Sequence, residues 1–339
     1  MAIKIGINGF GRIGRSVLRI AAEQPEKFDI CGINLRKADI PYMVYLMKYD
    51  SVFGRFNGTI SELPDGICIN GKDVKVFSES VAADIRWDKC GAEYIVESTG
   101  AFNTTELSKS HLLNGAKKVV LTAPAHDDVT PTYVMGVNHM QYKSCYDVVS
   151  NASCTTNCLA PLVKVVHESF GIEQGLMTTI HSATAKQKPV DARAGRDYRT
   201  GRSVFNNIIP STTGAAKACT LVIPELAGRL TGMSFRVPTN NVSVTDLTAK
   251  LACHTTYAEV CKAVKAASEG SMKGIIAYTN DDVVSSDMRG EMHTCIFDEK
   301  AGIMQNGDFV KLIAWYDNEW GYSNKVLDLV SHMAQVDAK

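Results

Sequence analysis

The chain lacks the features that mark several large classes of protein. Its 36 Lys and Arg residues are balanced by 36 Asp and Glu residues, so no net charge attracts nucleic acid or an anionic membrane. It has no apolar run long enough to cross a bilayer, and its N-terminus does not resemble a signal peptide. The ten cysteines are scattered without the spacing of a disulfide framework. These absences predict a cytoplasmic protein whose primary partner is neither a membrane nor a nucleic acid.

What remains is the composition of an ordinary globular protein. The chain has 339 residues, more than one compact domain usually holds, and 45% of them are hydrophobic. In its first part, short apolar strands alternate with helical segments, which predicts parallel β-α-β units in a doubly wound sheet. We expect a helix at Arg15–Gln24 and strands at Ile3–Asn8, Phe28–Asn34, Tyr94–Glu97, Lys118–Leu121 and Asp147–Ser150.

The pattern changes near residue 150, which predicts a domain boundary. Strands expected at Gly175–His181, Met233–Val237 and Ser243–Lys250 follow a polar stretch that opens a helix. From Ser182 to Pro210 the chain has six Arg or Lys residues and little periodicity, and so long a loop inside a domain is usually functional. The predicted organisation is a doubly wound α/β domain at 1–153, an α+β domain at 154–319, and a C-terminal helix at 320–339 that packs back on the first domain.

A glycine pattern follows the first expected strand. Gly9, Gly11 and Gly14 form G-x-G-x-x-G between a strand and a helix, the context required of a dinucleotide fingerprint. Gly9 permits a tight turn, Gly11 lets the backbone approach a pyrophosphate, and Gly14 lets helix and strand pack closely. The helix N-terminus then offers free N–H groups to the phosphates. The context favours a Rossmann site for NAD or NADP over a plain glycine turn.

The acidic residue expected at the end of the second strand is missing. NAD-selective sites usually place a carboxylate there, which binds the ribose hydroxyls and repels a 2′-phosphate. This chain has Leu35, followed by Arg36 and Lys37. Cations at this position attract a 2′-phosphate. We therefore predict that NADP is used well and favour it over NAD as the preferred cofactor; the alternative is that the two cations are solvated surface charges.

The stretch Ser150–Cys158 carries the clearest chemical signal. Ser153 suits a helix N-cap, which leaves Cys154 in the first helical turn. The positive end of a helix lowers a thiol pKa, and thiolate is the form that attacks a carbonyl. We expect Cys158 to be a small buried hydrophobe, and no His/Cys pair at ligand spacing predicts a metal site. Pro161 predicts an irregularity in the helix.

His181 stands at the end of an expected strand. Strand ends carry functional groups in open α/β sheets, so His181 is a candidate base for Cys154. A lone histidine in this position is more often structural, and the interpretation depends on the cysteine.

At these residues the chain resembles the phosphorylating glyceraldehyde-3-phosphate dehydrogenases. The resemblance covers essentially the whole chain, and it includes the conspicuous block Trp315-Tyr316-Asp317-Asn318-Glu319. The segments that carry it are Asn8–Arg15, Ser150–Cys158, Pro210–Lys217, Gly232–Pro238 and Trp315–Ser323.

The resemblance implies a covalent mechanism and a place in glycolysis or gluconeogenesis. Cys154 is then the nucleophile and His181 its base, and a hemithioacetal passes hydride to a nicotinamide to leave a thioester. Inorganic phosphate attacks the thioester and releases an acyl phosphate, 1,3-bisphosphoglycerate. The implied phosphate-binding residues are Ser153, Thr155, Thr213 and Gly214 for inorganic phosphate, and Thr184 and Arg236 for the substrate phosphate; Arg199 matches a nearby basic residue.

The resemblance also implies the cofactor residues and a homotetramer. Asn318 matches the residue that fixes the nicotinamide carboxamide, and the long loop is expected near a neighbour's cofactor. In that loop Arg193 replaces a common proline, which again favours NADP, and Lys186 replaces a small polar residue. The implied cofactor residues are Asn8, Gly9, Phe10, Gly11, Arg12, Ile13, Gly14, Asn34, Leu35, Arg36, Thr99, Gly100, Thr122 and Asn318.

Three other interpretations compete with this one. Erythrose-4-phosphate dehydrogenase shares the cysteine motif but departs at the Ser-Thr-x-Gly-Ala-Ala-Lys segment, which is intact here. Aspartate-semialdehyde dehydrogenase uses similar Cys/His chemistry without the Asn318 block. A non-enzymatic binding role, such as an RNA binder or a surface adhesin, fits poorly with balanced charge and complete catalytic motifs.

Overall fold

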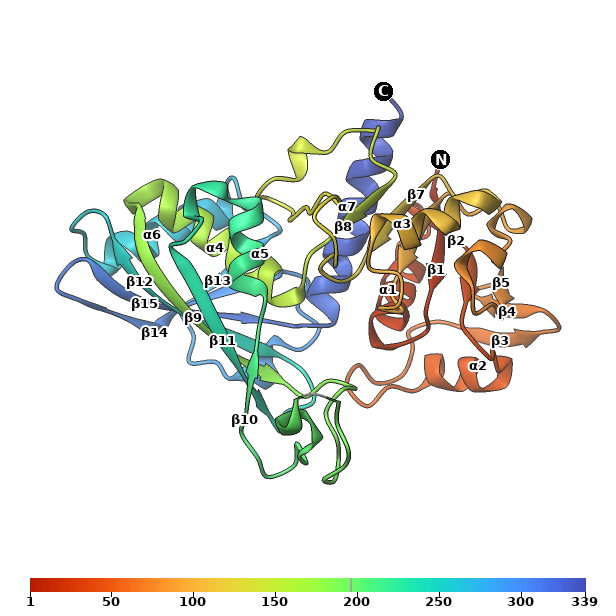
Figure 1. The fold of residues 1–339 in the computed structure, drawn as a ribbon, viewed down its shortest axis with the longest axis horizontal. Coiled ribbons are helices and arrows are strands. Elements are labelled where there is room, and N and C mark those ends of the chain that lie inside the picture. Colours follow the sequence, from red (N-terminus) through yellow and green to blue (C-terminus); the bar gives the residue numbers. More distant parts are fainter. Residues whose placement is uncertain (196) are drawn as a thin grey trace. The chain divides into compact units, whose positions relative to one another are not determined.

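The computed structural model describes residues 1–195 and 197–339, which form two compact units (Figure 1). The first unit comprises Met1–Ser153 and Ser323–Lys339, and the second comprises Cys154–Tyr322.

An eight-stranded sheet forms the centre of the first unit. Its strands are β1 (Ile3–Asn8), β2 (Phe28–Asn34), β3 (Ile60–Leu63), β4 (Gly66–Ile69), β5 (Lys72–Phe77), β6 (Tyr94–Glu97), β7 (Lys118–Leu121) and β8 (Val148–Ser150), in the order β3-β4-β5-β2-β1-β6-β7-β8. All neighbours from β5 to β8 pair in parallel, and the direction of winding reverses between β1 and β6. This topology confirms the predicted doubly wound sheet.

The expected helix at Arg15–Gln24 begins and ends too late. The observed helix α1 spans Arg12–Ala22, with Gly11 as its N-cap in an extended conformation. The turn after β1 is therefore shorter than the glycine pattern suggested, because Gly14 belongs to the first helical turn. A Cβ atom on Gly14 would lie 2.1 Å from the Gly9 carbonyl oxygen, so only glycine permits this approach.

Two further features of the first unit were not predicted. An antiparallel extension, β3 to β5, adds to the edge of the sheet, and helix α2 (Ile40–Lys48) lies between β2 and β3 in sequence. Helix α3 (Thr105–Ser108) follows β6.

The C-terminal part of helix α7 (Trp320–Asp337), from Ser323 onward, also belongs to this unit. There the Asp337 carboxylate accepts hydrogen bonds from Tyr94 (2.8 Å) and Tyr142 (3.0 Å).

The second unit contains a mixed seven-stranded sheet, as the α+β prediction requires. Helices α4 (Cys154–Phe170), α5 (Ala215–Val222) and α6 (Tyr257–Glu269) lie on one face of it (Figure 1). Its strands are β9 (Ile172–Ser182), β10 (Ile209–Thr212), β11 (Leu230–Val237), β12 (Ser243–Leu251), β13 (Ile276–Thr279), β14 (Cys295–Gln305) and β15 (Phe309–Tyr316), in the order β10-β11-β9-β12-β15-β14-β13.

The helix-covered face of this sheet forms the core of the second unit. Along β12 and β15 buried and less buried residues alternate, and Leu247, Leu312 and Ala314 are fully buried. Cys158 is also fully buried, as predicted, and α4 continues through Pro161 without a break. All ten cysteines are free thiols. In the described ranges no group of three His, Cys, Asp or Glu residues could hold a metal, and no helix has the length and apolarity of a membrane span.

Candidate active site

The reactive thiol and its candidate base are neighbours in the second unit. Helix α4 begins at Cys154, and His181 lies near the end of β9. The Cys154 Sγ atom lies 3.6 Å from His181 Nε2, within reach of proton transfer. Cys154 is half-buried, and His181 is only 5% exposed. The structure therefore brings together two residues that are far apart in the sequence.

The expectation that the helix start lowers the thiol pKa in the ligand-free chain is wrong. Burial raises the pKa of Cys154, and this effect exceeds the opposing effects of the Arg236 charge and of hydrogen bonds from Thr155. Burial also lowers the pKa of His181 to about 3, and Arg236 lowers it further. The pair is therefore a thiol beside a neutral imidazole before any ligand binds.

Arg236 contacts the other ring nitrogen of His181. In the parallel pairing of β11 with β9, Arg236 stands opposite His181. Its Nη1 lies 2.5 Å from His181 Nδ1 and 3.2 Å from the Ser182 carbonyl oxygen, which itself lies 2.8 Å from Nδ1. The Arg236 Nε–H is buried and has no partner among residues 1–195 and 197–339. An arginine with an unused buried donor is suited to receive an anion.

The two neighbours of His181 Nδ1 favour opposite tautomers. A guanidinium has no lone pair, so its contact with Nδ1 requires that Nδ1 carry no proton, which places the proton on Nε2. Donation from Nδ1 to the Ser182 carbonyl instead leaves Nε2 free to accept the thiol proton. A ligand that draws Arg236 away from the ring therefore favours the tautomer that can act as a base.

The predicted phosphate-binding residues occupy different environments. Thr184 donates its hydroxyl and its backbone N–H to Gln187 Oε1, at 2.8 and 2.9 Å, an orienting contact that sequence reasoning missed. The Thr155 hydroxyl is buried and bonds Tyr316 Oη at 2.8 Å, so its side chain faces the core. Thr213 accepts from the Ala215 backbone N–H, and the exposed Gly214 is the N-cap of α5.

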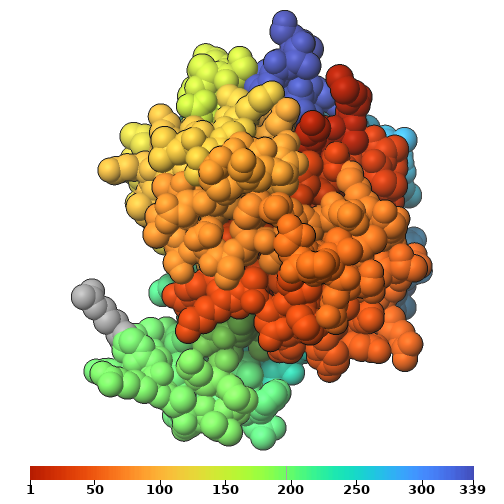
Figure 2. All heavy atoms as spheres, turned by 90° about the vertical axis from the view of Figure 1, so that its right-hand side faces the viewer, coloured from red at the N-terminus to blue at the C-terminus, as the bar shows by residue number. Residues whose placement is uncertain are grey.

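In the long loop, residues 183–195 and 197–208 lie largely at the surface of the second unit, drawn in green in Figure 2. Lys186, Arg193 and Arg199 are exposed, and Arg199 belongs to a short 3-10 helix at Tyr198–Gly201. Ser153 is half-buried at the last position of the first unit.

Asn318 is fixed by two hydroxyl groups that the sequence did not reveal. Its Oδ1 accepts hydrogen bonds from Ser182 (2.8 Å) and Ser243 (2.9 Å), and the residue is 6% exposed. Because both bonds hold the oxygen, the Nδ2 group is the one left to donate. A fixed donor of this kind matches the carbonyl oxygen of a nicotinamide carboxamide.

In the first unit, the three glycines form the cradle that a pyrophosphate requires. Gly9 has a φ of +104°, and a Cβ atom there would lie 2.9 Å from the Ser98 carbonyl carbon. A Cβ on Gly11 would meet nothing within 4 Å, so open space faces the start of α1. The α1 N-terminus has no side-chain cap, which leaves its N–H groups for an anion. The geometry therefore fits a dinucleotide phosphate.

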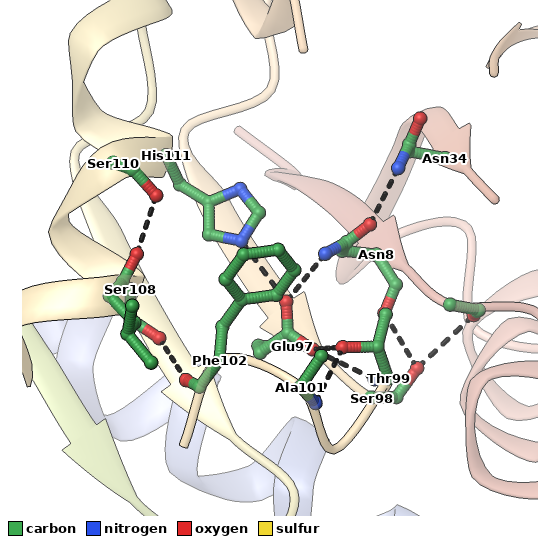
Figure 3. Close-up of polar contacts among 12 residues, drawn as sticks. Asn8, Asn34, Glu97, Ser98, Thr99, Ala101, Phe102, Ser108, Ser110 and His111 are labelled. Carbon is green, nitrogen blue, oxygen red and sulfur yellow. Dashed lines mark hydrogen bonds and ion pairs between the residues drawn. The ribbon is translucent and has the colours of Figure 1, made fainter. Parts of the chain in front are cut away.

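Asn8 and Asn34 form a hydrogen-bonded row at the ends of β1 and β2 (Figure 3). Asn34 Nδ2 donates to Asn8 Oδ1 at 2.7 Å, and Asn8 Nδ2 donates to Glu97 Oε2 at 2.5 Å. The Thr99 backbone N–H donates to Glu97 Oε1 at 2.8 Å. Glu97 was not among the residues that the sequence singled out.

The remaining predicted cofactor residues lie around this row. Phe10 is buried, and Ile13 is half-buried. Gly100 has a φ of +73°, and the Thr122 hydroxyl donates to the Glu97 carbonyl at 3.1 Å. The Arg12 guanidinium makes a bidentate contact with the Asp50 carboxylate.

The segment that follows β2 presents two cationic side chains at the surface. Leu35 is half-buried, and its backbone N–H donates to the Phe77 carbonyl at 3.2 Å. Arg36 and Lys37 are both exposed, and no carboxylate in the described part of the chain forms an ion pair with either. The strand end therefore presents positive charge where most NAD sites present a carboxylate.

Comparison with known proteins covers both units. Residues 3–105 match the family model "Glyceraldehyde 3-phosphate dehydrogenase, NAD binding domain", and residues 153–318 match the corresponding C-terminal domain. Glyceraldehyde-3-phosphate dehydrogenase of Claviceps purpurea (strain 20.1) is 57% identical over 338 residues, which cover 100% of this chain and 99% of that protein. The protein of the same name from Shimwellia blattae is 56% identical, over 99% of this chain and 100% of its own length.

Proposed function

The chain belongs to the glyceraldehyde-3-phosphate dehydrogenase family, and we propose that Cys154 and His181 carry out its chemistry. The protein is an oxidoreductase of glycolysis that oxidises glyceraldehyde 3-phosphate with phosphate and NAD(P). Erythrose-4-phosphate dehydrogenase is not favoured, because the full-length relatives bear the other name. The observation that supports the assignment of residues is the 3.6 Å contact between Cys154 Sγ and His181 Nε2.

In the proposed mechanism, His181 Nε2 takes the thiol proton as Cys154 Sγ adds to the aldehyde carbon. The resulting imidazolium stabilises the oxyanion and donates its proton to it, which gives the hemithioacetal hydroxyl. His181 takes this proton back as the C–H bond of the same carbon breaks. When bound, the nicotinamide supplies the hydride acceptor. The product is a thioester on Cys154, and attack by a phosphate oxygen on its carbonyl carbon releases the Cys154 thiolate and an acyl phosphate.

We place the two phosphate groups on the residues indicated by the sequence. Arg236 and Thr184 bind the substrate phosphate, supported by the unused Nε donor of Arg236 and the fixed orientation of Thr184. Inorganic phosphate is assigned to Ser153, Thr155, Thr213 and Gly214, and Arg199 is the additional basic residue expected near the substrate phosphate. Since the Thr155 hydroxyl faces Tyr316, its main chain is the part that we assign to phosphate.

The cofactor site proposed here lies on the first unit. The glycine cradle holds the pyrophosphate, and Asn34, Leu35 and Arg36 face the adenosine ribose. The contact with the nicotinamide carboxamide is assigned to Asn318 on the basis of the family resemblance. We further propose that NADP is preferred over NAD. The exposed, unpaired Arg36 and Lys37 support this preference, together with the absence of a carboxylate at Leu35.

Two finer features remain proposals from the family resemblance. We propose a cytoplasmic homotetramer in which the loop from Ser182 to Pro210 approaches a neighbour's cofactor. Light scattering coupled to size exclusion tests the tetramer, and a monomer at working concentrations would contradict it.

The experiment that tests the function is a steady-state assay with glyceraldehyde 3-phosphate and NADP or NAD. Beyond one equivalent per active site, reduced cofactor should accumulate only when phosphate or arsenate is added, because either anion discharges the thioester. Full turnover in buffer free of both anions would point to a hydrolytic aldehyde dehydrogenase instead. The matched control is Cys158→Ser, which alters a buried thiol one helical turn away and should retain most of the activity.

A further inference from the structure

A buried carboxylate joins the loops that surround the proposed dinucleotide site. Glu97, the last residue of β6, is 1% exposed. Its Oε1 accepts from the Thr99 backbone N–H (2.8 Å) and the Thr99 hydroxyl (2.5 Å), and its Oε2 accepts from Asn8 Nδ2 (2.5 Å) and His111 Nε2 (3.0 Å) (Figure 3). Among the described residues no Lys or Arg pairs with it. Four hydrogen-bond donors therefore replace the water that a buried carboxylate loses.

This carboxylate links three adjacent strand ends. Asn8 ends β1, Glu97 ends β6, and Asn34, which donates to Asn8, ends β2. The glycine turn begins directly after Asn8, and Thr99 lies in the loop that follows β6. Because β1 and β6 flank the point where the winding reverses, both loops border the place where such sheets bind ligands. The position of both loops thus depends on one side chain.

His111 is held in one tautomer by Trp87. Both side chains are 0% exposed, and Trp87 Nε1 donates to His111 Nδ1 at 3.2 Å. An indole nitrogen can only donate, so His111 Nδ1 must accept and Nε2 must carry the proton that it donates to Glu97. The chain of contacts therefore runs in one direction, from Trp87 through His111 to the Glu97 carboxylate.

We propose that Glu97 and His111 are positioning residues of the dinucleotide site, acting through Asn8 and Thr99 without touching the cofactor. The proposal rests on the proposed function, and it adds residues that neither the sequence motifs nor the family comparison assigned. The donors on both oxygens are fixed. On the Oε2 side, Asn8 Oδ1 already accepts from Asn34, and His111 Nδ1 from Trp87; on the Oε1 side, one donor is the Thr99 backbone N–H. A donor group in place of either Glu97 oxygen therefore meets a donor that cannot turn away.

The test compares cofactor binding in Glu97→Gln and in wild type. Glutamine keeps the size of the side chain but replaces one acceptor with an NH₂ group. The dissociation constant of the reduced cofactor, from fluorescence titration, should rise about tenfold or more, because the clash displaces Asn8 and Thr99 and cofactor binding must then return their loops to the wild-type position. The turnover number at saturating cofactor should stay within about threefold, and the alkylation rate of Cys154 should not change. The matched control is Glu93→Gln, which removes an exposed ion pair with Lys117 just before β6.

A second pair of variants separates positioning from packing. Trp87→Phe keeps an aromatic ring but removes the N–H that fixes the His111 tautomer, together with part of the buried indole. It should raise the same dissociation constant about two- to fivefold, and the change in the free energy of unfolding measures the loss of packing separately. In the His111→Gln background, Trp87→Phe should not raise the dissociation constant further, because position 111 then has no imidazole ring whose tautomer Trp87 could fix. His126→Gln, on an exposed histidine, is the control.

The outcomes distinguish this inference from the proposed function. Unaltered cofactor binding in a folded Glu97→Gln, or additive effects of Trp87→Phe and His111→Gln, would overturn the positioning role. If Glu97→Gln does not fold, the Trp87→Phe and His111→Gln pair decides the matter. A wild type without phosphate-dependent dehydrogenase activity, but with cofactor binding weakened by Glu97→Gln, would overturn the proposed function and leave the positioning role intact.

Discussion

Arg236 Nη1 lies 2.5 Å from His181 Nδ1, at the ring nitrogen that faces away from the Cys154 thiol. Through one hydrogen bond this contact joins Arg236, which is proposed to bind the substrate phosphate, to His181, the proposed base. The positive charge of Arg236 lowers the pKa of Cys154, although burial has the larger, opposite effect. We therefore expect phosphate binding and thiol chemistry to be coupled through this arginine.

Replacing Arg236 should separate its two contributions. Arg236→Gln loses both the phosphate contact and the charge, so we expect the KM for glyceraldehyde 3-phosphate to rise about tenfold or more. Because the charge favours thiolate, the pH midpoint of Cys154 alkylation should also rise. Arg236→Lys keeps the charge and should retain the midpoint while still raising KM. A midpoint that does not move in Arg236→Gln would argue against the electrostatic coupling.

Replacing His181 should affect both the rate and the thiol. His181→Asn removes the proton acceptor beside Cys154, and turnover should fall by roughly 10²–10⁴, the usual contribution of a positioned acid–base group. Without the imidazole that takes up the thiol proton as Cys154 attacks, alkylation of Cys154 should require a higher pH. Iodoacetamide kinetics across pH provides the measurement, and a profile identical to that of wild type would remove His181 from thiol activation.

The buried neutral His181 should also make the fold sensitive to acid. Its folded pKa, about 3, lies below its ordinary value of 6.5, so below pH 6.5 the unfolded chain binds a proton that the folded chain does not. As the pH is lowered below 6.5, the free energy of unfolding should therefore decrease, by at most about 1.4 kcal/mol per pH unit.

The useful window for this measurement lies between pH 6.5 and 4.5. Below pH 4.5 Glu291 acts in the same direction, because its hydrogen bond with His293 lowers its pKa to about 2. Urea denaturation followed by tryptophan fluorescence should show a smaller loss of stability in His181→Asn than in wild type. Parallel pH dependences in the two proteins would show that His181 is not the residue responsible.

The cofactor preference can be tested at the end of β2. In Leu35→Asp a carboxylate would repel a 2′-phosphate, so kcat/KM with NADP should fall at least tenfold while that with NAD is retained or improves. Arg36→Gln should lower kcat/KM with NADP about tenfold, because a charge-assisted contact is lost. A wild type that strongly prefers NAD, with no NADP loss in Leu35→Asp, would show that these cations do not read the 2′-phosphate.

The hydroxyls behind Asn318 should influence the cofactor without contacting it. Ser243→Ala removes one of the two hydrogen bonds that hold Asn318 Oδ1, so the amide becomes freer to turn. The KM for the dinucleotide should rise a few-fold, and the double variant with Ser182→Ala should rise further. Cys154 alkylation serves as the control, and an unchanged KM in the double variant would contradict the orienting role.

The sequence was sufficient for the features that depend on local patterns. The glycine spacing and the strand–helix alternation predicted the doubly wound sheet, and Ser153 and Cys154 predicted the start of α4. Element boundaries were less accurate: α1 begins at Arg12 because Gly14 packs within the first turn, a tertiary contact that the spacing does not reveal.

Features that depend on pairing between distant segments were not predictable. The register between β9 and β11 places Arg236 opposite His181, and that register is invisible in a single sequence. The same holds for Glu97 and His111, which look like ordinary polar residues until the fold buries them together. The sign of the Cys154 pKa shift was also wrong, because burial depends on the packing around the thiol and not on its helix position alone.

The central claim, a thioester on Cys154, can be tested by mass spectrometry of the intact protein. Enzyme mixed with glyceraldehyde 3-phosphate and oxidised cofactor, without phosphate or arsenate, should gain one phosphoglyceroyl group, and peptide mapping should place it on Cys154. Addition of phosphate should remove the group and release reduced cofactor in further turnovers, whereas folded Cys154→Ser should gain no mass. An acyl group on another cysteine, or phosphate-dependent turnover that persists in Cys154→Ser, would contradict the account.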